Sequence, residues 1–166
     1  GTQREVLVYV PQQYDGTKPA CLLVCMDGIL YDATTVMDNL IASGEMPVTI
    51  GVFVNPGVVY DEDGEVVRYN RCKEFDSTDD TFSQFIENEV LAKVEGMKTP
   101  SGKAIILSKD ANDRAITGAS SGGIAAFSVA WNRPDLYSRV YTTVGTFVAM
   151  RGGNNYSNLF IFNIKI

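Results

Sequence analysis

The sequence predicts an α/β fold, in which a mostly parallel sheet carries helices on both faces. The main observation is that unbroken apolar runs of strand length alternate with segments of helical periodicity. The second is composition: 166 residues without a repeat, 45% of them hydrophobic and 20% charged, are typical of a folded domain. We therefore expect one continuous unit over residues 1–166.

The first third of the chain predicts three strands and one helix. Residues 4–11 alternate between apolar and polar side chains like a half-buried strand, and ACLLVCM at 20–26 has the pattern of a fully buried one. Apolar residues at helical spacing over 34–44 predict a helix that ends at Gly44. A second buried strand, VTIGVFV at 48–54, ends at Asn-Pro-Gly.

The middle of the chain begins with a long polar connection. Residues 58–76 are expected to be irregular, with a turn at 62–64. Residues 77–96 predict an amphipathic helix that starts with a capping-box pattern, Ser77 with Asp80. Its apolar stripe consists of Phe82, Phe85, Ile86, Val90 and Leu91.

The last part of the chain continues the alternation. Residues 102–110 predict either a short strand or an extended segment that wraps the domain. A short strand at 114–118, a helix at 121–133 closed by a proline, and a strand at 138–145 follow. NLFIFNIKI at 158–166 alternates with period two, and we expect it to pair beside the preceding strand.

Composition excludes several classes of function. The formal net charge of −6, without any Lys/Arg cluster, argues against nucleic acids and anionic membranes as partners. Because the chain has no histidine, we expect no metal site, and no cofactor is expected either. Three scattered cysteines do not indicate a disulfide framework. The compartment stays undefined, since no signal pattern is present and the chain begins with Gly1.

The stretch GASSGG at 118–123 joins a predicted strand to a predicted helix. A Walker loop needs Gly-Lys-Ser/Thr at its end and a dinucleotide fingerprint needs G-x-G-x-x-G, and the spacing fits neither. A flexible linker is not expected between a buried strand and an apolar helix. G-x-S-x-G does fit, and it predicts a nucleophile elbow, in which a tight turn exposes the hydroxyl of Ser120 beside a helix N-terminus.

Backbone amides near Ser120 are candidates for an oxyanion hole. The N-terminus of the following helix offers N–H groups and the positive end of a dipole, and the N–H of Ser121 is the first expected donor. A second donor is expected from the loop after the first buried strand, where Gly28 and Ile29 are the candidates. A plain β-turn at Asp27-Gly28 is the alternative interpretation.

Several stretches, in order, resemble the putative-esterase branch of the α/β-hydrolase fold, which contains enterochelin esterases, feruloyl and acetylxylan esterases and S-formylglutathione hydrolase (esterase D). They are VYVPQQYDGTKPACLLVCMDG, VMDNLIASGEMPVTIGVFVNPG, NRCKEFD, FIENEVLAKV, RAITGASSGG and PDLYSRVYTTVGTF, and they cover most of residues 5–156. The resemblance implies hydrolysis of small carboxylic esters through an acyl-enzyme, with Ser120 as nucleophile.

The resemblance also implies a structural or binding role for two charged residues. Arg71 and Glu74 match the Arg-x-x-Glu stretch of the family. An ion pair that holds their loop is the preferred interpretation. A role in substrate binding, shared with Asp27, is the alternative.

The chain departs from the family after the strand at 138–145. The family triad runs Ser, then Asp or Glu, then His, with both partners after this strand, and the remaining residues hold no carboxylate and no histidine. We therefore expect a partial α/β-hydrolase core that lacks the usual C-terminal strands and helices. The expected function is a serine carboxylesterase whose triad is incomplete in this chain. A non-catalytic hydrolase-like module for binding or assembly is the alternative.

The edge of the sheet beside 138–145 also bears on partners. An open edge is a template for pairing with another strand. Either residues 158–166 or a second copy of the chain is expected to cover it, and in the second case the protein is a homo-oligomer.

Overall fold

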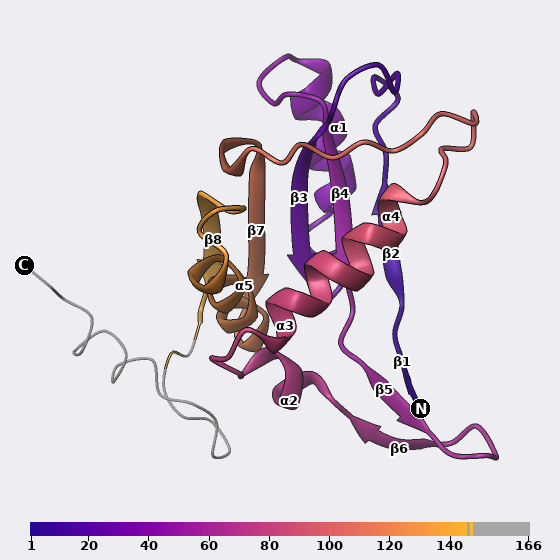
Figure 1. The fold of residues 1–166 in the computed structure, drawn as a ribbon, viewed down its shortest axis with the longest axis vertical. Coiled ribbons are helices and arrows are strands. Elements are labelled where there is room, and N and C mark those ends of the chain that lie inside the picture. Colours follow the sequence, from indigo (N-terminus) through magenta and orange to yellow (C-terminus); the bar gives the residue numbers. More distant parts are fainter. Residues whose placement is uncertain (146, 148–166) are drawn as a thin grey trace, which may run out of the picture.

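The computed structural model describes residues 1–145 and 147, and its central feature is a five-stranded sheet (Figure 1). The strands are β2 (Val6–Tyr9), β3 (Cys21–Met26), β4 (Thr49–Val54), β7 (Arg114–Ala119) and β8 (Arg139–Thr143). Their order is β2-β4-β3-β7-β8, and among these described strands only β2 runs antiparallel to its neighbour. The predicted α/β fold is confirmed. The sheet is mixed because no helix lies between β2 and β3 to make a parallel crossover. The chain therefore reverses direction after β2, and β3 and the later strands of this sheet run opposite to β2.

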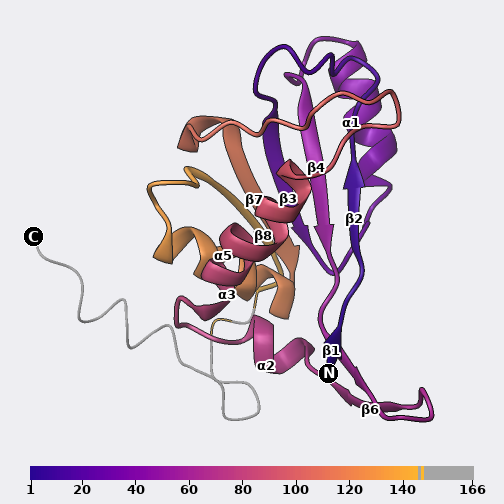
Figure 2. The ribbon, with the colours of Figure 1, turned by 45° about the vertical axis from the view of Figure 1, so that its right-hand side comes forward.

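Helices cover both faces of this sheet, as predicted (Figure 2). α1 (Ala33–Ala42) lies on one face, where its buried Met37 joins Cys25 and Phe53 in a small apolar cluster. The other face carries α3 (Thr81–Phe85), the π-helical turn η1 (Ile86–Leu91), α4 (Ala92–Glu95) and α5 (Ser121–Asn132). Val24 and Val52, the chain neighbours of Cys25 and Phe53, belong to the main core on that side, as the alternation of strand side chains requires.

The prediction that residues 58–76 are irregular is wrong. They form a hairpin and a short helix. β5 (Val58–Tyr60) and β6 (Val66–Tyr69) join β1 (Thr2–Gln3) in a separate antiparallel sheet, and α2 (Arg71–Phe75) follows. The turn predicted at 62–64 is confirmed, since Gly64 has a φ of +84° and Asp61 Oδ1 accepts two backbone N–H bonds within the turn. The hairpin escaped prediction because every residue of β6 is exposed, so the strand shows no buried alternation.

The helix predicted over 77–96 begins later, at Thr81, and its capping box is not formed. Asp80 occupies the N-cap without a side-chain capping bond, and the Ser77 carbonyl accepts a hydrogen bond from Ser128 Oγ of α5 at 2.9 Å. Contact with α5 therefore holds the first predicted turn outside the helix. The apolar stripe is confirmed, with Phe82, Ile86, Val90 and Leu91 buried and Phe85 packed beside them.

Residues 102–110 form an extended segment, the second of the two alternatives. Two backbone hydrogen bonds join Ala20 to this segment. The Ala20 N–H donates to the Ile106 carbonyl at 2.9 Å, and the Ala20 carbonyl accepts from the Ser108 N–H at 2.8 Å. The 3₁₀ turn η2 (Ala111–Asp113) then leads into β7.

Three further expectations concern disulfides, metal sites and the strand at 158–166. The three cysteines are thiols without a disulfide. In the part of the chain that the structure describes, no helix is long and apolar enough to cross a bilayer, and no group of side chains could hold a metal ion. The strand expected at 158–166, with its contact at the sheet edge, lies outside the described residues.

Candidate active site

Ser120 lies in a sharp turn between β7 and α5. Its backbone has φ 55° and ψ −124°, in the positive-φ region that non-glycine residues rarely adopt. Its N–H donates to the Thr143 carbonyl of the neighbouring strand end at 3.0 Å, which fixes the turn to the sheet. The side chain is half-buried, and its hydroxyl is not used to cap α5.

Glycines surround Ser120 because the chain segments there nearly touch. A Cβ on Gly118 would lie 2.2 Å from the Gly122 carbonyl oxygen, and a Cβ on Gly122 would lie 2.5 Å from an Asp27 carboxylate oxygen. A Cβ on Gly123 would meet the Gly118 oxygen at 3.1 Å. Strand, turn and helix can approach this closely only without side chains at these three positions.

The first amides of α5 follow directly after Ser120. The first intrahelical bond runs from the Ile124 N–H to the Ser120 carbonyl at 3.1 Å, so the amides of residues 121–123 have no acceptor in their own helix. Ser121 is buried as a whole residue, so its hydroxyl is not the one that this turn exposes. α5 has no acidic residue of its own in the first turn, and the Asp27 carboxylate lies against Gly122 at the positive end of the helix dipole.

The loop after β3 lies at the same sheet edge as Ser120, because β3 and β7 are adjacent and parallel. The loop is no plain β-turn: residues 27, 28, 31 and 32 all have positive φ, between 50° and 75°. Asn55, at the end of β4, packs against Gly28, where a Cβ would meet its Oδ1 at 2.7 Å. Ile29 is 44% exposed, in the middle of this loop.

Asp27 and Arg71 form a bidentate ion pair next to the Ser120 turn. Arg71 Nε and Nη2 donate to the two Asp27 oxygens at 2.6 and 2.7 Å, and this bonding raises the pKa of the guanidinium. Nη2 also lies 3.4 Å from the carbonyl oxygen of Ala119, the residue before Ser120. Both charged groups are thus engaged with each other.

Glu74 is engaged elsewhere. Its oxygens accept bonds from Arg4 at 2.9 and 3.0 Å and from the Gly57 N–H at 3.0 Å. Arg71 and Glu74 therefore do not pair with each other; each ties α2 to a different segment. Sequence reasoning missed Arg4 and Asn55, since no local spacing marks contacts between residues 50 or more positions apart.

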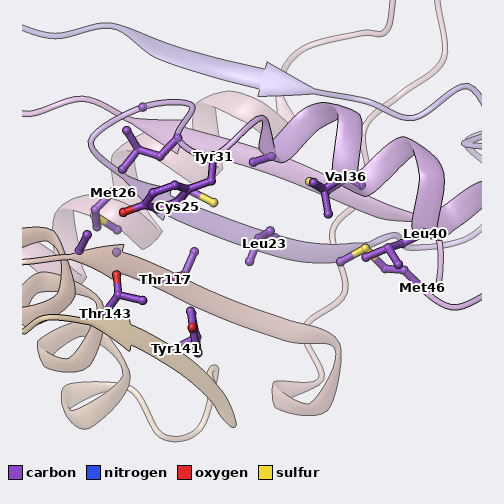
Figure 3. Close-up of a pocket in the computed structure, with 16 residues that line it drawn as sticks. Leu23, Cys25, Met26, Tyr31, Val36, Leu40, Met46, Thr117, Tyr141 and Thr143 are labelled. Carbon is purple, nitrogen blue, oxygen red and sulfur yellow. The ribbon is translucent and has the colours of Figure 1, made fainter.

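An apolar cavity of about 380 Å³ opens next to the loop after β3 (Figure 3). It lies between α1 and the strands β3, β7 and β8, on the sheet face opposite α5, and none of the described residues that line it is charged. Tyr31, Val36 and Tyr141 are exposed around it. Burial raises the pKa of Cys25 in its wall to about 12, so this thiol is no nucleophile near neutral pH.

The five-stranded sheet, with helices on both faces and an elbow-like turn at its carboxyl edge, has the fold of the α/β-hydrolase-like esterases. The model of the family described as "Putative esterase" matches residues 1–148, and the chain belongs to this family. No curated protein sequence matches the chain.

Solved esterase structures share the fold. The ferric enterobactin esterase of Salmonella typhimurium has a TM-score of 0.67 at 18% identity, over 87% of this chain and 33% of that one. The enterobactin esterase of Shigella flexneri, solved with enterobactin, has 0.68 at 19% identity, over 93% and 37%. The ferulic acid esterase of Anaeromyces mucronatus has 0.58 at 15% identity, over 92% and 63%. The chain spans about a third of the length of the two enterobactin esterases.

Proposed function

We propose that the protein is a serine carboxylesterase that hydrolyses small esters through an acyl-Ser120 intermediate. One observation carries the proposal: the positive-φ backbone of Ser120, between β7 and a helix whose first three amides have no acceptor within that helix. This is the geometry that a nucleophile elbow requires. Membership of the esterase family supports it independently.

The proposed reaction uses these groups in two steps. Ser120 Oγ attacks the ester carbonyl carbon while its proton passes to a base, and the carbonyl oxygen becomes an oxyanion. The amides of Ser121 and of Gly28 or Ile29 hold that charge. The tetrahedral centre collapses, the C–O bond to the alcohol breaks, and the alcohol leaves with the proton from the base. Water, deprotonated by the same base, then attacks the acyl carbon. The bond between this carbon and Ser120 Oγ breaks, Oγ takes the proton back from the base, and the acid leaves.

The base does not come from a histidine of these 166 residues, because they contain none. We propose that the base and its acid partner are supplied by a part of the protein outside this chain. Loss of triad members costs on the order of 10⁴ to 10⁶ in turnover, while the oxyanion hole and binding retain roughly 10³ over water. The 166-residue chain alone is expected to turn over p-nitrophenyl acetate at least about 10⁴-fold more slowly than a complete enzyme.

Labelling with a fluorophosphonate tests the nucleophile without requiring turnover. Intact-mass spectrometry is expected to show slow addition of one probe, lost in Ser120→Ala. Ser121→Ala is the matched control: it removes the neighbouring hydroxyl but keeps the backbone N–H, so labelling persists. Labelling that survives Ser120→Ala would overturn the proposal.

A non-catalytic binding or assembly module is the second candidate, favoured by the absence of histidine. It predicts no probe addition to the wild-type chain at any concentration, and also none in a longer chain that contains the remaining family region.

A further inference from the structure

We infer that Arg71 is a positioning residue for the oxyanion hole, holding the loop after β3 against the elbow through Asp27. The inference rests on the proposed function. It assigns Asp27 and Arg71 to the alignment of backbone amides rather than to contact with substrate. Three sets of contacts support it.

The first set joins α2 to the loop. The Arg71–Asp27 pair has two hydrogen bonds of 2.6 and 2.7 Å, and the two side chains are 35% and 17% exposed. Bidentate guanidinium–carboxylate pairs fix orientation as well as distance. Arg71 is the first residue of α2, and its guanidinium also lies 5.7 Å from the centre of the Phe75 ring one turn later. The Phe75 ring, in the same helix as Arg71, therefore helps to orient the guanidinium that binds Asp27.

The second set joins the same two residues to the elbow. Arg71 Nη2 lies 3.4 Å from the Ala119 carbonyl, which precedes Ser120. The Asp27 carboxylate rests on Gly122, where a side chain would meet it at 2.5 Å. One ion pair thus touches both sides of the candidate oxyanion hole: the loop that carries Gly28 and Ile29, and the turn that carries Ser121.

The third set shows why the loop needs this support. Positive φ at residues 27, 28, 31 and 32 means that regular strand or helix bonding does not hold it. At its start, the Asp27 N–H donates to the Val54 carbonyl at 3.0 Å, and at its end the Ala33 N–H donates to Leu30 at 3.1 Å. Between these bonds, the positions of the Gly28 and Ile29 amides depend on side-chain contacts. Among the described residues, the Asp27–Arg71 pair is the ion pair that joins this loop to another segment.

The test measures the rate of fluorophosphonate labelling of Ser120 against probe concentration. Arg71→Met and Asp27→Asn are each expected to lower the limiting rate about 100-fold, the loss typical of one misplaced oxyanion donor, with little change in the half-saturating concentration. Because both substitutions break one pair, the double variant is expected to be no slower than either single variant. Arg71→Lys keeps the charge without the bidentate geometry and is expected to recover only part of the rate.

The matched control is another bidentate pair, Arg133 with Asp135, whose bonds of 2.9 and 2.7 Å lie at the opposite end of α5. Arg133→Met is expected to label at the wild-type rate. Thermal unfolding shows which variants are folded. If Arg71→Met is unfolded, the labelling rate of the isosteric Asp27→Asn variant is the test. Wild-type rates in Asp27→Asn and Arg71→Lys, or multiplicative losses in the double variant, would overturn the inference. An unlabelled wild-type chain, or labelling that survives Ser120→Ala, would instead contradict the proposed function.

Discussion

Gly118→Ala is expected to lower the rate of Ser120 labelling by about 100-fold or more and to destabilise the fold. The added methyl would lie 2.2 Å from the Gly122 carbonyl oxygen, and that atom is backbone, so no side chain can move aside. The turn must open to admit it, which displaces Ser120 from the amides of α5. A displacement of about 1 Å costs on the order of 100-fold in rate, and overpacking of this kind costs up to about 3 kcal/mol.

The measurement combines labelling rate with urea unfolding. Gly96→Ala is the matched control, because its new Cβ would have ordinary contacts, the nearest at 3.4 Å. It is expected to label at the wild-type rate. A Gly118→Ala variant with wild-type labelling would mean that the close approach of strand and helix does not position Ser120.

Glu87→Gln is expected to destabilise the protein by about 3 to 5 kcal/mol, the usual cost of breaking a buried ion pair from one side. Arg114, the first residue of β7, is fully buried, and its Nη2 donates to both Glu87 oxygens at 2.7 and 2.8 Å. Tyr137 completes the cluster through bonds of 2.6 Å to Glu87 and 3.0 Å to Arg114. Within the described residues, Nε and Nη1 of Arg114 have no hydrogen-bond partner, so removing the carboxylate leaves the buried cation without its counter-charge.

Urea unfolding of two further variants separates this effect from a general loss of charge. Lys109→Met breaks an ion pair whose lysine is 60% exposed, and it is expected to cost less than about 1 kcal/mol. The double variant Glu87→Leu with Arg114→Met removes both buried charges and is expected to recover most of the stability. A loss below about 1 kcal/mol in Glu87→Gln would show that Arg114 finds another counter-charge.

The parts of the fold that sequence reasoning predicted are those governed by local pattern. Every residue of the apolar run that became β4 is buried, as are four of the six in β3, and the G-x-S-x-G turn is determined by residues within a few positions of Ser120. The hairpin β5–β6 was missed because it has no buried face to impose a period on the sequence. The capping box at Ser77 failed because the Ser77 hydroxyl accepts a bond from the Asp79 N–H, two residues on, and the helix begins only at Thr81.

In the candidate site, too, contacts between residues close in sequence were predicted and contacts between distant residues were not. Ser120 and its glycines are close in sequence, so their pattern is recognisable. The partner of Arg71 lies 44 positions away, at the end of a different strand, and only the sheet order brings Asp27 beside the elbow. A motif match pointed to Arg71 and Glu74 together, yet the structure gives them different partners because α2 turns them toward different segments.

A crystal structure of the fluorophosphonate-treated chain tests the central claim most directly. The account predicts a phosphorus atom bonded to Ser120 Oγ, with its phosphoryl oxygen within hydrogen-bond distance of the Ser121 N–H and of an amide from Gly28 or Ile29. The account is contradicted if Ser120 is unmodified with its oxygen turned into the core, or if the phosphoryl oxygen of the adduct contacts none of these amides.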